Sequence, residues 1–582
     1  MSFFPKPGDD PLQKVNQLPG HVQEKIHEWL RYPLDRESVQ ALATLLQEDL
    51  PGVINAFDRD LSFGTSGVRA LTGIGSYRLN VYTIAKLSQA VANYLRKDNL
   101  RIIIAYDNRK DSLLFATVAA RVLAAANIHV YVLKEIRPSP FLSFAIRLNR
   151  CDAGIMITAS HNPKEYNGYE LYGDDGGAID TAMEEGIQSA LSNISSFEQV
   201  HMTPIYDPHI EWINPITWDA AYLSAIKALQ YFPEQDYKLG NTLQIVYSSL
   251  HGTGSTLAPK ALASWGFSSL YLVEEQINPD PAFPTLTYPN PGDKEASQLG
   301  LQKLAQTSSD LFIANDCDAD RIGVAVMHKG LPCMLSGNEL SILCAYHLCS
   351  HYAKLSYPLQ KMIILTVISS DLIKYLVEDF HMRWIEVPVG FKYISAKMRE
   401  WGDKVDEYFL MGTEESYGCL MGTYARNKDG IAGAAVIAEI ALQAKVQGKT
   451  LIDLLHTIYT KYGLFPEKLH SLEFHNSSEG LKKRDELMYS LRSDPPSKIG
   501  SLPVISYVDY LAPDPSLIQT DMIIMQLKDH SKIVIRPSGT EPLLRVYVSS
   551  HIKNFTSIEE GKKQGDLYVA GLLQDVLQCF SQ

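Results

Sequence analysis

The segment TASHNP, residues 158–163, sets a serine beside a histidine at the point where an apolar run ends. Ser160 could serve there as a nucleophile, as a phosphate-binding hydroxyl or as an ordinary turn residue. A histidine in such a place, here His161, is by itself more often a local partner in the turn than a catalyst. The choice depends on which other chemical groups the chain can bring to this serine.

The segment DCDADR carries three carboxylates at alternate positions, Asp316, Asp318 and Asp320. Carboxylates so close together repel one another unless a cation or protons neutralise them, and Mg²⁺ takes oxygen ligands of this kind. A calcium-binding EF-hand loop is excluded, because Arg321 and Met327 stand where that loop has glycine and glutamate. A solvated acidic turn is the remaining alternative. Arg321, directly after the triad, indicates that a further anion lies close by.

The segment RPSGTEP, residues 536–542, has the composition of a phosphate-binding loop. An arginine can hold a phosphate with two hydrogen bonds, and a glycine lets successive backbone amides turn towards an anion. The polar and glycine positions of this region are Arg536, Ser538, Gly539, Thr540 and, a little later, Arg545. A plain hairpin turn is the alternative, because type I and type II turns favour the same residues.

Two further loops are weaker signals. FGTSGVR, residues 63–69, combines glycines and hydroxyls with Arg69, and GTEESYG places Glu414 and Ser416 on a turn where they could bind sugar hydroxyls. Ordinary loops explain each of these segments equally well. A phosphorylated sugar with a divalent cation, however, would use these loops, the serine loop, the aspartates and the phosphate-binding loop all at once.

Apolar strands alternate with helical segments over residues 101–160, 243–316 and 339–413, which predicts α/β units with parallel sheets. TASHNP, DCDADR and GTEESYG each follow directly on a predicted strand, and ligands of such sheets bind at the carboxyl ends of strands. The three loops could therefore face one shared crevice, and ordinary loops that follow strands are the alternative. After residue 475, successive strands lack intervening helices, which indicates an α+β unit with antiparallel strands.

The predicted fold class is α/β, with three similar α/β domains that have mixed sheets and a C-terminal α+β domain, arranged around a central active-site cleft. The predicted limits are a helical N-terminal extension over 1–55, α/β domains over 56–212, 213–335 and 336–470, and the α+β domain over 471–582.

The 582-residue chain has a formal net charge of -13, and so acidic a protein is unsuited to non-specific nucleic-acid binding, which uses Lys and Arg to neutralise phosphates. The N-terminal residues lack the basic start and apolar core of a signal peptide, and no uncharged apolar run is long enough to span a bilayer. Seven cysteines without a CxxC pair are typical of a reduced cytoplasmic protein. We expect a cytoplasmic monomer or homodimer with no nucleic-acid or membrane partner.

The motifs FGTSGVR, TASHNP, DCDADR, GTEESYG and RPSGTEP, in this order, resemble those of the α-D-phosphohexomutase family. The stretch PDPAFPTLTYPNP, residues 279–291, and the long N-terminal extension look like the branch that includes phosphoglucomutases and phosphopentomutases. The resemblance implies an enzyme that interconverts glucose 1-phosphate and glucose 6-phosphate. It also implies a phosphoserine on the enzyme, bound Mg²⁺, and glucose 1,6-bisphosphate as activator and intermediate.

The resemblance implies a role for each site residue. Ser160 would carry the phosphoryl group. The Mg²⁺ ligands would be Asp316, Asp318, Asp320 and an oxygen of the phosphorylated Ser160. In addition to Ser160, the catalytic residues would be His161, Lys428 and Arg69. The substrate-binding residues would be Arg321, Gly390, Lys392, Glu414, Ser416, Arg536, Ser538, Gly539, Thr540 and Arg545.

One position departs from the family pattern. Many relatives have a lysine at the end of the NGxK stretch that follows TASHNP, whereas this chain reads NGYE and has Glu170 there. The change removes a candidate acid/base or phosphate-binding group. Lys428 or His161 could cover that role.

Three other functions compete with this interpretation. Within the family, glucose phosphates are favoured over pentose, mannose and glucosamine phosphates, and GTEESYG is closer to the phosphoglucomutase form than to the forms of the mannose and glucosamine enzymes. Phosphomannomutase and phosphopentomutase activities are the alternatives. A metal-dependent phosphatase with an aspartyl nucleophile is disfavoured, because Asp320 replaces the threonine or valine of its DxDx[TV] motif. A sugar-phosphate sensor without catalysis would not need Ser160 together with all three aspartates.

Overall fold

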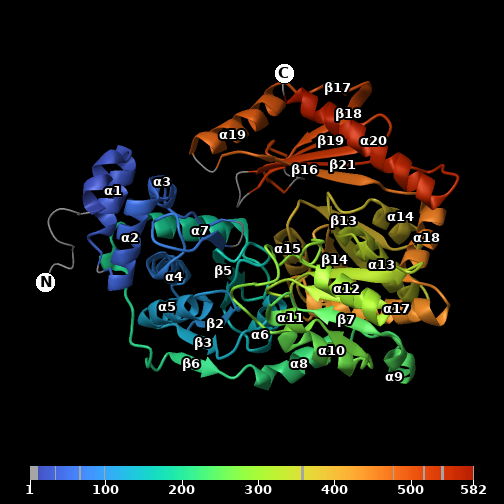
Figure 1. Cartoon of the computed structure of the whole chain (residues 1–582), viewed down its shortest axis with the longest axis horizontal. Helices are drawn as coiled ribbons and strands as arrows, with labels where there is room; N and C mark the ends of the chain where they lie inside the picture. Colours follow the sequence, from blue (N-terminus) through green and yellow to red (C-terminus); the bar gives the residue numbers. More distant parts are fainter. Residues whose placement is uncertain are drawn as a thin grey trace.

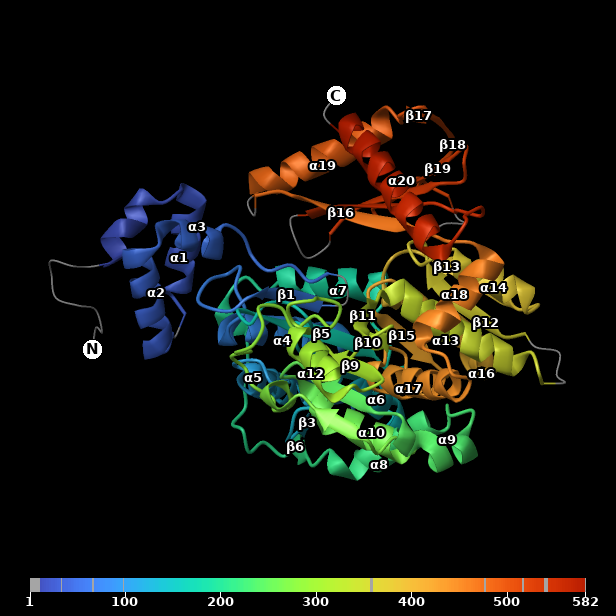
Figure 2. The same cartoon turned by 45° about the vertical axis from the view of Figure 1, so that its right-hand side comes forward.

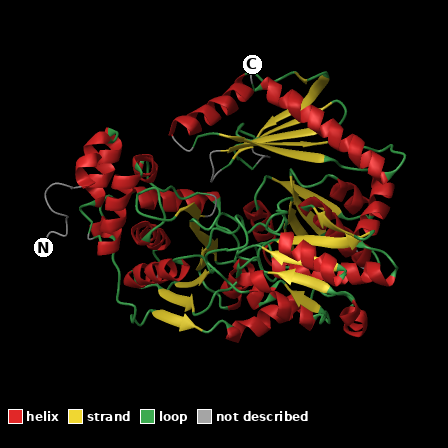
Figure 3. Cartoon of the chain, in the orientation of Figure 1, coloured by secondary structure: helices red, strands yellow, loops and turns green. Residues whose placement is uncertain are grey.

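The computed structural model describes residues 11–32, 34–64, 67–97, 99–355, 360–475, 478–514, 518–538 and 543–580. These residues form a helical bundle near the N-terminus and four larger units, each built on a β-sheet. Figure 1 and Figure 2 show the bundle beside the first unit, with the fourth unit lying above the other three. Helices pack around the sheets of the first three units (Figure 3).

The N-terminal bundle consists of α1 (Gly20–Trp29), α2 (Arg36–Glu48) and α3 (Leu50–Phe57). Asp35 and Asp49 cap α2 and α3 by accepting a backbone N–H three residues further on, at 2.7 and 2.9 Å. Trp29 packs edge-on against Tyr82 of the first unit, with ring centroids 5.6 Å apart. The bundle therefore has its own apolar core and is attached to the first unit through aromatic side chains.

The first unit has a six-stranded mixed sheet in the order β1-β5-β4-β2-β3-β6. Its elements are β1 (Gly67–Leu71), α4 (Val81–Leu95), β2 (Arg101–Tyr106), α5 (Ser112–Ala125), β3 (His129–Leu133), α6 (Ser139–Leu148), β4 (Ala153–Ile157), β5 (Tyr166–Gly173), α7 (Thr181–Ser192) and β6 (Ile210–Ile213). Along β2, Ile102 and Ile104 belong to one apolar cluster and Ile103 to another, as alternating side chains of a strand require. The strand is continuously apolar because both faces of the sheet are covered.

The second unit has a five-stranded sheet in the order β11-β10-β9-β7-β8. Its elements are α8 (Ile216–Lys227), α9 (Pro233–Leu239), β7 (Ile245–Ser248), α10 (Ala258–Ser264), β8 (Leu270–Leu272), α11 (Glu274–Ile277), α12 (Gln298–Thr307), β9 (Leu311–Asn315), β10 (Ile322–His328) and β11 (Leu331–Leu335). Strand β7 is parallel to β8 and β9, while β10 runs antiparallel to both of its neighbours.

The third unit has a four-stranded sheet in the order β13-β12-β14-β15. Its elements are α13 (Gly337–Tyr352), β12 (Met362–Thr366), α14 (Leu372–Asp379), β13 (Arg383–Val387), α15 (Phe391–Trp401), α16 (Val405–Tyr408), β14 (Phe409–Glu414), β15 (Gly418–Met421), α17 (Gly430–Val446) and α18 (Leu451–Tyr462). Helix α17 is rich in alanine and buried along most of its length between α10 of the second unit and α13 of its own. Within the described ranges, no helix is both long enough and apolar enough to cross a membrane.

The fourth unit has a six-stranded antiparallel sheet in the order β16-β21-β20-β19-β18-β17. Its elements are β16 (Glu467–Glu473), α19 (Ser478–Ser493), β17 (Lys498–Ile499), β18 (Leu502–Asp509), β19 (Ile523–Leu527), β20 (Lys532–Pro537), β21 (Leu543–Ser549) and α20 (Ile558–Cys579). Val546 and Val548 of β21 are buried in the core that the sheet shares with α20, whereas Arg545 and Tyr547 alternate onto the other face and are half-buried. The cationic residues of this sheet are thereby kept out of its core.

The predicted fold class, three similar α/β units with mixed sheets and a C-terminal unit, is confirmed. The alternation of strands and helices did not predict the hairpin partners β5, β10 and β15, which return antiparallel to β4, β9 and β14. In each of these three units, the polar loop that carries the candidate site residues is therefore the connection of a β-hairpin.

Candidate active site

Polar side chains from three separate sheets meet at the ends of these hairpins. The hydroxyl of Ser160, after β4, donates to Asp316 Oδ2, after β9, at 3.0 Å. Lys428, between β15 and α17, places its Nζ 3.2 Å from Asp320 Oδ2 and 3.4 Å from Glu414 Oε2. The expectation that the three loops come together is confirmed.

Ser160 lies in a tightly fixed turn. Its φ of +49° places the backbone in the left-handed region, which residues other than glycine rarely adopt. Its backbone N–H donates to Thr158 Oγ1 at 2.8 Å, and Arg109 donates to the carbonyls of Ser160 and Asn162 at 2.6 and 2.5 Å. These hydrogen bonds hold the loop in the strained conformation, and the hydroxyl of Ser160 is turned towards the second unit.

His161 is held as a neutral ring. Its Nδ1 contacts a guanidinium N–H of Arg321 and lies 3.5 Å from Ser160 Oγ. Burial, followed by the positive charges of Arg321 and Arg69, lowers the pKa of His161 well below its usual value. Because Nδ1 accepts from Arg321, Nε2 carries the ring hydrogen and can donate to an anion.

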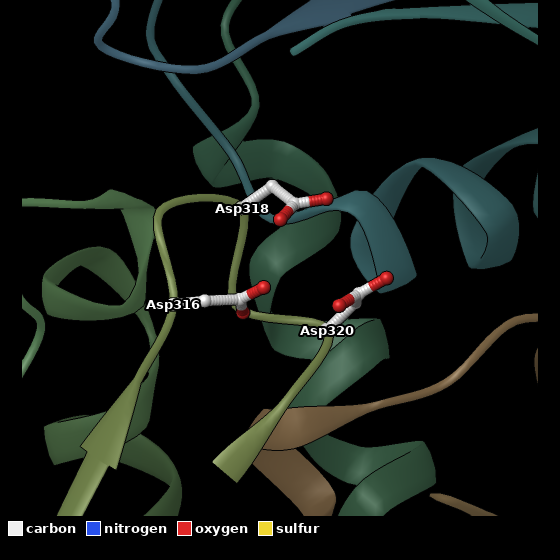
Figure 4. A group of neighbouring side chains, drawn as sticks. All are labelled: Asp316, Asp318 and Asp320. Atoms are coloured by element: carbon white, nitrogen blue, oxygen red, sulfur yellow. The ribbon is translucent and has the colours of Figure 1, made fainter. Parts of the chain in front are cut away.

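Asp316, Asp318 and Asp320 form a compact group on the loop between β9 and β10 (Figure 4). Each offers one carboxylate oxygen within 4.8 Å of the others, and all three residues are buried. Asp318 Oδ2 accepts from the hydroxyl of Ser139, at the start of α6 in the first unit, at 2.5 Å. Asp318 Oδ1 and Asp320 Oδ1 have no hydrogen-bond partner among the described residues. Three buried carboxylates with oxygens to spare suit a hard divalent cation.

The charges around this group are unbalanced. Burial and the charge of Asp320 raise the pKa of Asp316 to about 7 and that of Asp318 well above its usual value. Burial would also raise the pKa of Asp320, but the adjacent charges of Lys428 and Arg321 hold it below its usual value. Without a cation, this site therefore retains protons that a bound divalent ion would displace.

The Lys428 side chain is closely packed, and its charge is paired with two carboxylates. Burial would lower the pKa of its ammonium, but Asp320 and Glu414 raise that pKa above its usual value. A Cβ atom on Gly418 would lie 2.1 Å from Lys428 Cδ, so β15 leaves room for this side chain only because residue 418 is glycine. Ser416 lies half-buried in the turn between β14 and β15.

The fourth unit contributes two arginines on neighbouring strands. Arg536 of β20 and Arg545 of β21 are directly paired across the sheet. Burial and Glu414 raise the pKa of Glu415 to about 7, against the opposing charges of these two arginines. Ser538 is buried, and its backbone N–H closes the hairpin by donating to the Leu543 carbonyl at 2.8 Å. The two remaining loop positions, Gly539 and Thr540, lie outside the described residues.

Gly390 and Lys392 lie at the start of α15. Gly390 has a φ of +127°, which favours glycine. Lys392 Nζ lies 3.1 and 3.3 Å from the carboxylate oxygens of Glu184, on α7 of the first unit. In the described part of the chain, the ion pair of Lys392 is thus with Glu184 and not with the groups around Ser160.

Arg69, on β1, is paired with the residue that departs from the family pattern. Its Nε and Nη2 donate to Glu170 Oε1 at 3.1 and 2.6 Å, and its Nη1 lies 3.5 Å from Asn162 Oδ1 in the serine loop. Arg69 therefore reaches the serine loop at Asn162, but a carboxylate of its own unit already occupies one edge of the guanidinium.

Sequence reasoning missed three residues that shape the site: Arg109, Ser139 and Glu184. Arg109 follows β2 just as Ser160 follows β4, so the rule that polar loops follow strands could have found it. Ser139 and Glu184 act across unit boundaries, and no local pattern reveals such contacts.

Comparison with known proteins gives one consistent result over most of the chain. Residues 60–198, 220–330 and 336–462 match the models of phosphoglucomutase/phosphomannomutase alpha/beta/alpha domains I, II and III. Residues 514–553 match the C-terminal domain of the same proteins.

Relatives and solved structures agree with these matches. A phosphoglucomutase of Staphylococcus aureus (strain bovine RF122 / ET3-1) is 35% identical over 524 residues, covering 87% of this chain and 92% of that protein. A phosphoglucomutase/phosphomannomutase family protein of Burkholderia thailandensis superposes with a TM-score of 0.65 at 18% identity, covering 89% of this chain and 96% of the other. The Paramecium phosphoglucomutase parafusin, in an open form, gives a TM-score of 0.65 at 17% identity with the same coverage, and these two likenesses show the fold alone.

Proposed function

The chain belongs to the phosphoglucomutase/phosphomannomutase family and is a phosphohexomutase, and from this premise we propose that it interconverts glucose 1-phosphate and glucose 6-phosphate. The observation that carries the proposal is the hydroxyl of Ser160, 3.0 Å from Asp316 in a buried group of three aspartates. A nucleophile placed beside a divalent-cation site is what phosphoryl transfer requires.

The proposed cycle starts from an enzyme phosphorylated at Ser160. The free hydroxyl of the sugar phosphate attacks the phosphorus, the bond from phosphorus to Ser160 Oγ breaks, and the hydroxyl proton passes in net terms to Ser160. The product is glucose 1,6-bisphosphate, which turns around in the site and returns its other phosphoryl group to Ser160. Phosphoryl transfer of this kind depends mainly on positioning and on charge stabilisation.

We assign the surrounding residues by their contacts. Asp316, Asp318 and Asp320, with an oxygen of the phosphorylated serine, would hold Mg²⁺, which neutralises charge on the transferring group. Lys428 stays protonated between Asp320 and Glu414 and stabilises negative charge at the sugar side. Neutral His161 donates a hydrogen bond from Nε2 to the phosphate.

The substrate would be held at both ends. Glu414 and Ser416 would bind sugar hydroxyls, and Gly390, Lys392 and Arg321 would line the route of the turning intermediate. The cradle for the phosphate that is not being transferred would consist of Arg536, Ser538, Gly539, Thr540 and Arg545. A fixed cradle serves both orientations of the bisphosphate, because each orientation presents a phosphate to it.

A turnover panel tests the proposal. Glucose 1-phosphate, mannose 1-phosphate, glucosamine 1-phosphate and ribose 1-phosphate are compared, each with and without glucose 1,6-bisphosphate. We expect kcat/KM to be highest for glucose 1-phosphate and to depend on the bisphosphate. A preference for mannose or ribose phosphate would reassign the substrate. An absence of turnover with every sugar phosphate would favour the alternative function, a sugar-phosphate sensor without catalysis.

A further inference from the structure

The contacts of Glu170 form a chain that crosses from the first unit to the third. Arg69 donates to Glu170 Oε1 from Nε and Nη2, at 3.1 and 2.6 Å, and the Tyr172 hydroxyl donates to Oε2 at 3.1 Å. Asn427 Nδ2 donates to the Tyr172 hydroxyl at 3.1 Å. Asn427 Oδ1 in turn accepts the backbone N–H of Lys428 at 2.9 Å.

Each link of this chain has a fixed direction. Burial and the charge of Glu170 raise the pKa of Tyr172 well above its usual value, so its hydroxyl keeps the hydrogen that it donates. The lone pairs of the same oxygen remain available to the Asn427 amide. The amide orientation of Asn427 follows, because its nitrogen faces Tyr172 and its oxygen faces Lys428.

The two ends of the chain lie in the candidate active site. Arg69 reaches Asn162 in the serine loop at 3.5 Å, and Lys428 lies between the aspartate group and Glu414. Glu170 and Tyr172 are two residues apart on β5 and so point to the same face of the sheet. One strand of the first unit thus connects a cation beside the serine loop with a loop of the third unit.

We propose that Glu170, Tyr172 and Asn427 are positioning residues that fix Arg69 and Lys428 relative to each other across the interface of the first and third units. Both carboxylate oxygens of Glu170 already accept hydrogen bonds from Arg69 and Tyr172, so Glu170 acts through these partners and not as a base. The expected effect of these three residues on turnover rests on the proposed function. Their hydrogen bonds to one another do not depend on that function.

Turnover of glucose 1-phosphate tests the positioning role. Tyr172→Phe removes one hydroxyl, and we expect kcat to fall about 10- to 100-fold with little change in KM, because small displacements of reacting groups are costly. Asn427→Ala should have a similar effect. The kcat of the double variant, Tyr172→Phe with Asn427→Ala, should be no lower than that of either single variant, because both substitutions break the same series of hydrogen bonds. Fully multiplicative losses in kcat, or a wild-type kcat in Tyr172→Phe, would overturn the role.

Asp175→Asn is the matched control. Asp175 also links the first and third units, through Arg399, which donates to its two carboxylate oxygens at 3.0 Å each. It touches neither Arg69 nor Lys428, so this variant should keep the kcat of the wild type. An equal loss of kcat in Asp175→Asn would show that any weakening of the interface suffices, and would overturn the assignment to these three residues.

Hydrogen exchange tests the chain without requiring turnover. The Lys428 amide hydrogen is bonded to Asn427, so peptides covering 425–430 should exchange faster in Tyr172→Phe than in the wild type. An unchanged exchange rate in that variant would show that the hydrogen bonds from Tyr172 do not reach Lys428. A wild type that turns over none of the four sugar phosphates would instead overturn the proposed function and leave the exchange result to decide the chain.

Discussion

Ser160 keeps a left-handed backbone, with φ of +49°, although strain of this kind costs a residue other than glycine about 1–3 kcal/mol. Ala319 in the aspartate loop and Tyr417 in the third hairpin do the same, with φ of +54° and +69°. Arg109 maintains the first of these turns by donating to the carbonyls of Ser160, Asn162 and Pro163 in the serine loop. The strained residues of all three loops therefore lie at the turns from which the candidate catalytic groups project.

Two substitutions of Ser160 separate chemistry from strain. Ser160→Ala and Ser160→Gly both remove the hydroxyl, so we expect both to lose turnover and to lack the phosphoryl group that peptide mass analysis should find on the wild type. Ser160→Gly relieves the left-handed conformation, so its free energy of unfolding should exceed that of Ser160→Ala by about 1 kcal/mol. Full activity in either variant would disprove the nucleophile assignment.

The aspartate group predicts opposite effects on stability and on activity. Without Mg²⁺, burial and the charges of Asp320 and Asp316 raise the pKa of Asp318 well above its usual value, so near neutral pH this carboxyl lowers the stability of the folded protein. Asp318→Asn removes that ionisable group, so without Mg²⁺ at neutral pH the variant should melt at a higher temperature than the wild type. Its kcat should fall by about 100-fold or more, because the metal ion supplies several kcal/mol of charge stabilisation. The melting temperature should rise less on addition of Mg²⁺ than that of the wild type. Normal turnover after chelation would contradict the metal site.

At the scale of elements, each site loop joins the two strands of a hairpin. The second strand, which returns antiparallel, positions the loop as much as the first strand does. Strand β15 shows this most directly, because Gly418 leaves the space that the Lys428 side chain fills. The first strand of each hairpin was predictable, since β4, β9 and β14 contain apolar runs and are buried along their whole length.

The returning strands were not predictable from local pattern. Strand β5 reads YNGYELYG, in which two glycines and an asparagine resemble a loop, and its pairing with β1 and β4 is what makes it a strand. Local patterns in the sequence identified Ser160 and the aspartates as candidate site residues. They did not predict contacts between units, such as that of Ser139 with Asp318. Those contacts depend on how the units pack.

Gly418→Ala tests the role of β15. The added Cβ would meet Lys428 Cδ at 2.1 Å, so the flexible lysine must move while the backbone can stay in place. We expect kcat to fall about 10- to 100-fold with little loss of stability. Gly571→Ala in α20, where an added Cβ meets nothing within 4 Å, should keep full activity. Equal activity in the two variants would show that Lys428 needs no fixed position.

At the scale of the whole molecule, α17 joins the second and third units around a buried acidic pair. Glu439 of α17 accepts the backbone N–H groups of Tyr231 and Phe232 at 2.9 and 3.0 Å, and its other oxygen lies 2.8 Å from His347 Nε2. Burial, together with a hydrogen bond shared with Glu439, raises the pKa of Asp236 to about 8. A proton therefore belongs to this interface.

This proton makes stability depend on pH. Because the folded protein holds the Asp236 proton up to about pH 8 and the unfolded chain releases it near 3.8, the contribution of this group is greatest at low pH. It falls as pH rises between these two values. Asp236→Asn should flatten this part of the melting-temperature profile and raise the melting temperature at the alkaline end, with activity unchanged. An unaltered profile would contradict the shared proton.

The candidate site draws its groups from four successive units, from Ser160 in the first to Arg545 near the end of the last. A ribosome makes these units in order, so the nucleophile is synthesised long before its aspartates, its lysine and its arginines. A chain that stops early holds the serine but not the groups that would phosphorylate it. Under the proposed function, phosphoserine at Ser160 would therefore form only on molecules whose later units are complete and assembled, and the mass of the intact protein would show both features together.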